Sequence, residues 1–474
     1  MTKKAFKYDM QHGLGSCVLA LKNMEEAQRE AFRSVVLWGC SRDLAYDAQC
    51  EGCRSIYLYD LITEFSDVTP FLDVIERRLF RSVHSTGWEF HQDCEILAYF
   101  VSDRIKRAWK ILSACYHFLF QILLDSCEPD QYGRFAERDN FQSLCITLVS
   151  LCSGDRIQRV KIYQRIVRDL CTLSEENPWI SVDHFDWFQS VSEDSLGKKT
   201  MDKLLHRADA DASIKKYVRL MEEGNSAVES KWEKRRRAEP ETAAALYGLM
   251  QQGEKVGKMW TPVLMRRWLK QEKEQEVLQM AAYYRVEKDA AVRFQLLRLL
   301  ANKECAQMLD LERLMQDSKS EDAEFSEWAF EALAQRKDAR VRAYALDLLN
   351  QDLLNQEIYT AGAVSMLAKN YEICDRDIFV KAVKQIPITY RGRRWHGVFS
   401  DLLDLFETPG RGKPTELLLY MYRNTLCSFC REYIVKEMGR RRMLTQALLE
   451  EMQYDCNEDI RKYADKKLSG MMGI

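Results

Sequence analysis

The sequence predicts an all-α protein, with an α-α superhelix in its C-terminal half and an irregular helical domain in its N-terminal half. Only eight prolines and twenty glycines occur in 474 residues, which suits long helices because both residues disfavour helix interiors. No clear run of alternating apolar and polar residues with a hairpin turn is present, so we expect few strands. In addition, one short motif recurs along the C-terminal half.

The composition is that of a folded protein without a strong net charge. Hydrophobic residues make up 46% of the chain and charged residues 30%, and acids nearly balance bases at a net charge of −2. This balance excludes a positive field that would draw the whole molecule onto DNA or an anionic membrane. A nucleic-acid contact would therefore need a local basic patch.

The fifteen cysteines favour free thiols over a disulfide framework, since their number is odd and the N-terminal MTKKAFKYDM lacks the apolar stretch of a signal peptide. We expect a cytoplasmic protein whose cysteines are mostly buried. The longest apolar run, Ile111 to Leu124, includes His117 and Gln121 and is shorter than the roughly 20 residues that cross a bilayer. It predicts a buried helix and no membrane partner.

Local signals predict where several helices begin. Thr69-Pro70 and Thr261-Pro262 each pair a capping hydroxyl with a proline suited to the first turn. The segment from Asn23 to Glu26 has the pattern of a capping box ahead of an apolar-periodic segment at 27–38. Gly13-Leu-Gly15-Ser16 lacks the glycine spacing and the lysine of a phosphate loop, and predicts a turn before the first helix instead.

Composition shifts predict the domain organisation. Apolar periodicity lapses and charge dominates near 223–240, which we interpret as a linker between a helical domain at 1–222 and a repeat domain at 241–474. Further breaks are expected at 127–140 and at 390–413, where the second is a glycine- and arginine-rich segment that interrupts the repeat domain.

Three segments of the C-terminal half share one pattern: Asp or Asn, two residues, a β-branched apolar residue, arginine, and then apolar residues at helical spacing. They are Asp289 to Arg293, Asp338 to Arg342 and Asn457 to Arg461. The Asp or Asn suits a helix N-terminus, where it accepts backbone N–H bonds. The β-branched residue begins a buried stripe, and the arginine beside it can reach an acid in the turn below. One such hairpin cannot bury its apolar face alone, so neighbours must stack.

This pattern resembles the HEAT-repeat family, in which a turn aspartate and an arginine open the second helix of each hairpin. The resemblance covers about 275–470 and implies a HEAT-like solenoid there. The first two copies are 49 residues apart, beyond the roughly 40–47 of one unit, which a divergent repeat or a longer loop would explain. Cys427 to Arg431 fits the frame with cysteine in place of valine. Cys50 to Arg54 fits it too, which leaves open whether the N-terminal half is also HEAT-like.

No catalytic residue, cofactor or metal site is predicted. The Cys-x-x-Cys pairs that begin at Cys50 and Cys427 lack two further ligands at short spacing, so we interpret them as core cysteines. His91-x-x-Cys94 has metal-compatible spacing, but a single such pair is better explained by ordinary packing or a surface histidine. No histidine is followed by glutamate, which argues against zinc proteases and against the di-iron hydroxylases built on HEAT-like repeats.

An arginine-rich segment is the candidate ligand-contacting surface. Its residues are Tyr390, Arg391, Arg393, Arg394, Trp395, Arg411 and Lys413. Arginines can pair with phosphates and aromatic rings can stack on bases, as in a loop that projects from a solenoid. Alternatively, it is a solvated loop whose arginines pair with acids such as Asp401 and Asp404. Two other basic clusters, at 231–237 and 440–442, have acids nearby and fit solvated helix faces.

The sequence favours a non-catalytic scaffold or adaptor, whose helical-repeat surface binds a protein partner, over an enzyme. One alternative is nucleic-acid binding through the arginine-rich loops. Another is a DNA glycosylase, since some HEAT-like proteins remove alkylated bases with tryptophans and an acid. Trp260, Trp328 and Trp395 would then be the tryptophans, although no residue-level match supports this role. Fold analogy alone does not establish function, and neither the partner nor the oligomeric state follows from the sequence.

Overall fold

Every regular element in the described part of the chain is a helix, which confirms the all-α prediction. The computed structural model describes residues 1–47, 51–125, 136–151, 156–177, 180, 185–206, 212–221, 242–252, 262–351, 357–386, 393–408 and 412–472, leaving out the side chains at 206, 262–263, 357, 393–395 and 471–472. Within these ranges, no helix combines the length and the apolar character that crossing a membrane requires.

The helices pack into two compact units. Unit 1 comprises Met1–Arg237 together with Thr445–Ile474, and unit 2 comprises Ala238–Leu444. The predicted domain at 241–474 therefore extends beyond unit 2, because the C-terminal hairpin, formed by α27 (Gln446–Met452) and α28 (Glu458–Met472), packs with the N-terminal helices. The predicted linker at 223–240 lies outside the described residues.

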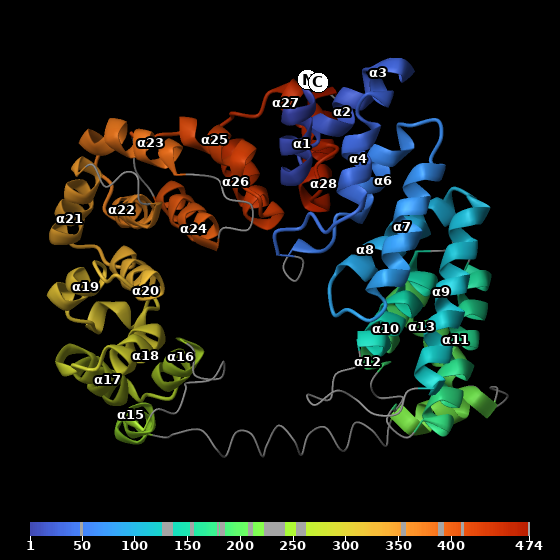
Figure 1. Cartoon of the computed structure of the whole chain (residues 1–474), viewed down its shortest axis with the longest axis horizontal. Coiled ribbons are helices and arrows are strands. Elements are labelled where there is room, and N and C mark those ends of the chain that lie inside the picture. Colours follow the sequence, from blue (N-terminus) through green and yellow to red (C-terminus); the bar gives the residue numbers. More distant parts are fainter. Residues whose placement is uncertain are drawn as a thin grey trace. The chain divides into compact units, whose positions relative to one another are not determined.

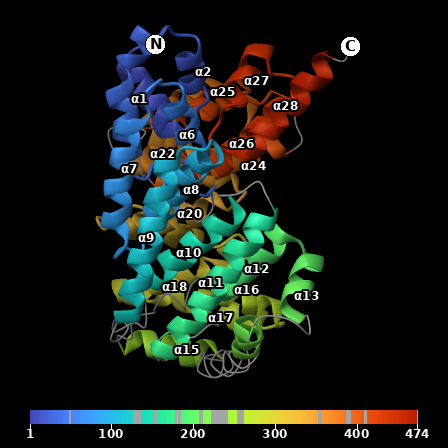
Figure 2. The ribbon, with the colours of Figure 1, turned by 90° about the vertical axis from the view of Figure 1, so that its right-hand side faces the viewer.

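Unit 1 is a succession of helices that pack on their neighbours along the chain (Figures 1 and 2). Figure 2 shows α9, α10 and α11 lying alongside one another. Its labelled helices are α1 (Lys3–His12), α2 (Ser16–Lys22), α3 (Glu26–Glu30), α4 (Arg33–Cys40), α6 (Ser55–Thr63), α7 (Thr69–Ser82), α8 (Glu89–Ser102), α9 (Lys106–Asp125), α10 (Ala136–Ser150), α11 (Arg156–Glu176), α12 (Asp186–Leu196), α13 (Lys198–His206), α27 (Gln446–Met452) and α28 (Glu458–Met472).

One apolar core runs through unit 1 from Phe6 to Tyr217 and includes Cys456 of the C-terminal hairpin. The apolar run predicted as a buried helix forms α9, which buries one face while His117 and Gln121 are exposed on the other. Most described cysteines are free and buried, as expected.

The C-terminal hairpin joins unit 1 at the turn between α1 and α2. Gly13 closes α1 in a left-handed conformation with φ +68°, and its carbonyl oxygen accepts a hydrogen bond from the Cys456 backbone N–H at 2.9 Å. In α28, Arg461 donates to the Asp60 carboxylate of α6 at 2.7 Å. The segment 13–15 is thus a turn that contacts the C-terminal hairpin, but it lies between α1 and α2 and not before the first helix, because residues 3–12 already form α1.

Unit 2 contains two rows of helices. The even row is α16 (Pro262–Lys270), α18 (Ala290–Leu300), α20 (Ala323–Ala334), α22 (Glu357–Lys369), α24 (Arg393–Glu407) and α26 (Ser428–Arg440), and each of these packs on the next (Figure 1). The odd row is α15 (Ala243–Gln251), α17 (Glu274–Val286), α19 (Leu311–Asp317), α21 (Ala339–Asn350), α23 (Arg376–Gln385) and α25 (Glu416–Asn424), with short turns η2 (Ala306–Met308) and η4 (Ile373–Asp375). Helical hairpins stacked side by side in this way are the arrangement of an α-solenoid.

The recurring motif opens helices of both units. Asp289 caps α18 by accepting from two backbone N–H groups, and Asp338 caps α21 in the same way with one. Asn457 accepts from the backbone N–H groups of Asp459 and Ile460 at the start of α28. The β-branched residue of each copy is buried, so the motif sets both the start of the helix and its core-facing side.

The arginine of each motif reaches a carboxylate on another element. Arg293 donates to Asp317 at the end of α19 at 3.2 Å, and Arg342 donates to Asp375 in η4 at 2.7 and 2.9 Å. In unit 2 each arginine therefore fastens its hairpin to the next hairpin along the chain, although Arg293 lies in an even-row helix and Arg342 in an odd-row helix.

Two local predictions are wrong. Asn23 ends α2 as its C-cap, because the residues before it already form a helix, and the capping box lies at Glu25 and Gln28 of α3. Pro70 does stand in the first turn of α7, but Thr69 is inside the helix and makes no side-chain cap.

The predicted break at 390–413 is also wrong in its centre, where Arg393–Glu407 forms α24. Although this segment is rich in glycine and arginine, it also contains apolar residues at helical spacing. Val398, Phe399, Leu402 and Phe406 are all buried, and they hold α24 against α22 and α26. Burial of this apolar stripe outweighs the weak helix propensity at its ends.

Candidate functional site

A lysine follows, or ends, each of four consecutive helices in the even row. Lys303 comes after α18, Lys337 after α20, Lys369 ends α22, and Lys413 comes after α24. Because equivalent helices of a stacked-hairpin fold run in the same direction, their C-terminal ends lie along one edge. The fold therefore brings these lysines together.

These four lysines line one groove of about 1180 Å³ in unit 2. The groove is also lined by Asp338, Ala339, Arg342, Ala368, Asn370, Tyr371, Glu372, Ile373, Cys374, Asp404, Leu405, Glu407 and Thr408. We call it the lysine groove. It contains both charged and apolar surface, and Ile373 at its rim is 63% exposed.

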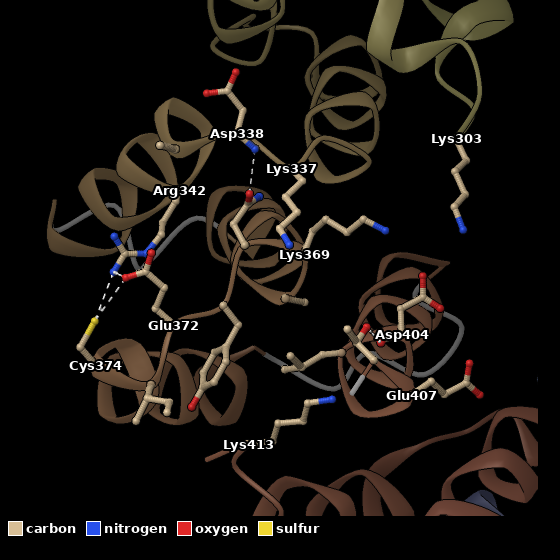
Figure 3. A pocket seen from close by; sticks show the side chains of 17 residues that line it. Lys303, Lys337, Asp338, Arg342, Lys369, Glu372, Cys374, Asp404, Glu407 and Lys413 are labelled. Carbon is tan, nitrogen blue, oxygen red and sulfur yellow. Dashed lines mark hydrogen bonds and ion pairs between the residues drawn. The ribbon is translucent and has the colours of Figure 1, made fainter. Parts of the chain in front are cut away.

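Figure 3 shows how the charged groups lie around this space. The amines of Lys337, Lys369 and Lys413 extend into the groove from three different places in the chain. The Lys303 side chain projects from the opposite side. The carboxylates of Asp404 and Glu407 project from the end of α24 along one wall. A ligand in the groove would meet amines on several sides and carboxylates on one.

The lysines of the groove are little used by the fold itself. Among the described residues, Lys303, Lys337 and Lys369 make no ion pair within 4 Å, whereas Lys413 donates to the carbonyl oxygen of Phe406 at 3.3 Å. Burial, together with the nearby Arg441, lowers the pKa of the Lys413 amine. An anionic group bound beside Lys413 would restore its preference for the charged form.

Hydrogen bonds of the Asn370 side chain link two of the turns that line the groove. Its side chain accepts from the Asp338 backbone N–H at 2.9 Å and donates to the carbonyl oxygens of Arg336 and Met366, both at 2.9 Å. Arg342 beside it is already paired with Glu372 and Asp375. The turns that carry Lys337 and Lys369 are therefore fixed to each other.

The predicted site residues fall in different places. Lys413 lines the lysine groove together with the repeat residues Asp338 and Arg342, whereas Asp289 and Arg293 lie two hairpins earlier and Asn457 and Arg461 belong to unit 1. Arg393, Arg394 and Trp395 begin α24. Tyr390, Arg391 and Arg411 lie outside the described residues.

Comparisons with known proteins do not identify the chain. No family model matches it, and no curated protein matches it. Among solved structures, an engineered protein is 15% identical, with 95% of this chain and 97% of that chain covered and a TM-score of 0.22. SYS-1 is 12% identical, with 98% and 96% covered and a TM-score of 0.24. Likenesses at this level carry no argument about the site or the function.

The other sequence candidates have local partners or lie outside the described part. Arg440 and Arg441 pair with Glu437 at 3.0 and 2.8 Å, and since Glu437 is buried, only the exposed Arg440 fits the solvated helix face that was expected. Trp328, one of the tryptophans considered for a glycosylase, is half-buried with the Arg298 guanidinium 5.8 Å from its ring. The basic cluster at 231–237 and Trp260 lie outside the described residues.

Two groups of metal-ligand type are brought together by the fold. In unit 1 they are Cys53, His91 and Glu95, and in unit 2 they are His396, Cys427 and Cys430. The pairing of each Cys-x-x-Cys segment with a distant histidine could not be seen in the sequence, because 34 residues separate His396 from Cys430.

The unit 1 group is a hydrogen-bonded network. Glu95 accepts from the Cys53 thiol at 2.8 Å and from the Ser55 hydroxyl at 2.5 Å, and lies 3.3 Å from the His91 imidazole. Burial and the Glu95 carboxylate raise the pKa of the Cys53 thiol, which keeps its proton. These bonds satisfy the carboxylate without an ion.

Proposed function

We propose that the protein is a non-catalytic scaffold of HEAT-like hairpins that binds an acidic segment of a protein partner in the lysine groove. The observation that carries this proposal is the row of lysines, one from each of four consecutive hairpins. Solenoids commonly bind extended segments because each repeat contributes an equivalent position along one surface. The buried free cysteines are in keeping with action in a reducing compartment such as the cytoplasm.

The lining of the groove favours a polypeptide over a nucleic acid. Asp404 and Glu407 form part of the wall, and they would repel a continuous phosphate backbone. Ile373 and Leu405 add apolar surface, which suits a peptide that alternates acidic and apolar side chains. A near-neutral net charge also gives no long-range attraction for nucleic acid.

A purely structural explanation of the lysines is that cations near helix C-termini offset the helix dipole. This effect acts on each helix separately and does not require the amines to share one space. Three of the four amines instead extend into a common groove from different turns. Binding and stability measurements on the same variants distinguish the two explanations.

The test uses the full chain and a fluorescent peptide of alternating glutamate and leucine, with single-stranded DNA of similar length as the second probe. The variant K303E/K337E/K369E reverses three groove charges. The matched control is K288E/K381E/K384E, which reverses three exposed lysines of unit 2 outside the groove. Thermal unfolding of both variants reports any loss of helix-end stability.

We expect the groove variant to bind the peptide roughly tenfold or more weakly, since three exposed ion pairs of about 0.5 kcal/mol each sum to about that factor. The control should bind as the wild type does. Equal loss in both variants, or no peptide binding by the wild type, would contradict the proposal. Tighter binding of the DNA probe, with a steep loss as salt rises, would favour the nucleic-acid alternative instead.

A further inference from the structure

His396, Cys427 and Cys430 form a compact donor set in unit 2, independent of the lysine groove. One ligand atom from each of the three residues lies within 4.8 Å of the other two. His396 is in the first turns of α24, Cys427 is the N-cap residue of α26, and Cys430 follows within its first turn. The set therefore joins two successive helices of the even row.

The separation of the histidine and one of the cysteines suits a tetrahedral ion. The His396 Nδ1 atom lies 3.5 Å from the Cys430 Sγ atom. Zinc–nitrogen and zinc–sulfur bonds of about 2.0 and 2.3 Å at tetrahedral angles place the two donors roughly 3.6 Å apart. His396 and Cys430 are therefore already at about the separation that a tetrahedral zinc ion requires.

The start of α26 suits thiolate ligands. The Cys427 Sγ atom accepts from the Cys430 backbone N–H at 3.5 Å, and a thiolate at a helix N-terminus is favoured by the dipole and the free N–H groups. Such N–H donors to sulfur are the outer contacts that support metal-bound cysteines. Both cysteines are buried, with exposed fractions of 3% and 6%.

The histidine connects the donor set to a cavity. His396 also lines a cavity of about 310 Å³ together with Asp401, Ser365 and Glu331. The two cysteines are buried and do not line this cavity, so the cavity reaches the donor set only at the histidine. The two-sulfur, one-nitrogen set is of the type that prefers zinc over magnesium or calcium, which select oxygen ligands.

We propose that His396, Cys427 and Cys430 bind one zinc ion, which clamps α24 to α26 and leaves its fourth position to water or an added ligand. This inference concerns a site separate from the proposed peptide groove and stands without it. It departs from the expectation, based on sequence spacing, that the chain has no metal site.

The test is a Co²⁺ titration of the full chain after chelator and reductant treatment, followed by displacement with Zn²⁺. We expect a sulfur-to-cobalt charge-transfer band and tetrahedral visible bands that saturate at one equivalent and vanish when zinc is added. C427S retains a helix-capping hydroxyl and C430S replaces sulfur by oxygen at the same position, so both should stay folded. H396A removes a ligand from outside the core. Each should weaken zinc binding by at least about tenfold.

The controls are C53S, in the unit 1 group, and C374S, an exposed cysteine of unit 2. Both should keep the wild-type cobalt spectrum. A second readout is the melting temperature, which zinc should raise in the wild type but not in C427S or C430S, because an ion that binds only the folded state stabilises it. The inference fails if the wild type shows no charge-transfer band, if C53S alone abolishes it, or if H396A leaves zinc affinity unchanged.

Discussion

Arg461 of α28 donates a hydrogen bond to the Asp60 carboxylate of α6 at 2.7 Å, across 401 residues of chain. The two side chains are largely buried, with exposed fractions of 14% and 23%. The motif arginine that fastens neighbouring hairpins in unit 2 therefore fastens the last helix to an N-terminal helix in unit 1. This contact, with the backbone bond from Cys456 to Gly13, makes unit 1 discontinuous in sequence.

Removing this contact should loosen the C-terminal hairpin. We expect R461A to lower the free energy of local unfolding of residues 446–472 by roughly 1–3 kcal/mol, because a charged, partly buried hydrogen bond is lost. Hydrogen exchange of the peptides that cover α27 and α28 measures it. R461A/D60A should lose little more than R461A alone, and the neighbouring K462A, whose amine pairs with acids of its own helix, should leave exchange unchanged. Additive losses in the double variant would show that the two residues do not act together.

The close packing at Gly15 should also be needed to hold the C-terminal hairpin in place. A Cβ atom at this position would overlap the carbonyl oxygen of Glu451 in α27, so G15A must push the C-terminal hairpin away from α2. We expect a loss of about 1–3 kcal/mol in the stability of unit 1, seen by thermal unfolding and by faster exchange in α27. The control is G470A in α28, where an added Cβ meets nothing within 4 Å and better helix propensity should be neutral or stabilising. Wild-type behaviour of G15A would rule out this tight contact.

Asp317 is the acceptor of a buried network in unit 2. It accepts from the Tyr284 hydroxyl at 2.7 Å and from Arg293 at 3.2 Å, and it is 5% exposed. We expect D317A to cost about 3–5 kcal/mol, because it leaves a largely buried arginine without its carboxylate. Y284F removes one hydrogen bond and should cost only about 1 kcal/mol. Denaturant unfolding followed by hydrogen exchange in α17–α19 measures both.

The control for this network is an ion pair on the surface of the same unit. Arg376 pairs with Glu416 at 2.9 Å, and both side chains are substantially exposed. E416Q should therefore change the unfolding midpoint little, since solvent screens such pairs. If D317A were no worse than E416Q, the network would not be what fastens α18 to α19.

These contacts show which features the sequence could predict. The caps made by Asp289 and Asp338 depend on residues two or three positions away, and the buried helix at 106–125 depends on one apolar run. Such features depend on residues close together in the sequence, so the sequence alone is enough to predict them. The same holds for the all-α class, which follows from periodicity and from the scarcity of helix-breaking residues.

The carboxylates that pair with the motif arginines could not be predicted, because they depend on how each hairpin stacks on the next. Asp317 and Asp375 lie 24 and 33 residues beyond their arginines, at different places in the next hairpin. The four groove lysines are spaced unevenly in sequence and become neighbours only through the ends of the even-row helices. The predicted arginine-rich segment included only Lys413 of the four, although the recurrence of lysine near the ends of these helices was a usable signal.

The last prediction concerns Asp401 of α24, whose surroundings resist its ionisation. Burial raises the pKa of its carboxyl group to about 7, and the nearby Asp404 and Glu331 add to this, while the Ser365 hydroxyl and Lys369 oppose it. The unfolded chain has a pKa near 4 at this position. Between about pH 4 and 7 the unfolded state therefore loses its proton while the folded state keeps it.

Stability must fall as pH rises through this window, because the folded state binds more protons than the unfolded state. The full penalty, reached above about pH 7, is of the order of 4 kcal/mol for a difference of three pKa units. D401N cannot ionise and its amide can still bond to Ser365, so its advantage over the wild type should grow from near zero at pH 4 to a plateau at pH 8. D404N, which removes an exposed charge from the same helix, should change stability by no more than about 0.5 kcal/mol. Denaturant unfolding at four pH values measures this difference in the free energy of unfolding. If the difference between D401N and the wild type stayed constant with pH, Asp401 would be ionised in the folded protein throughout. Water or a cation would then offset the cost of its burial.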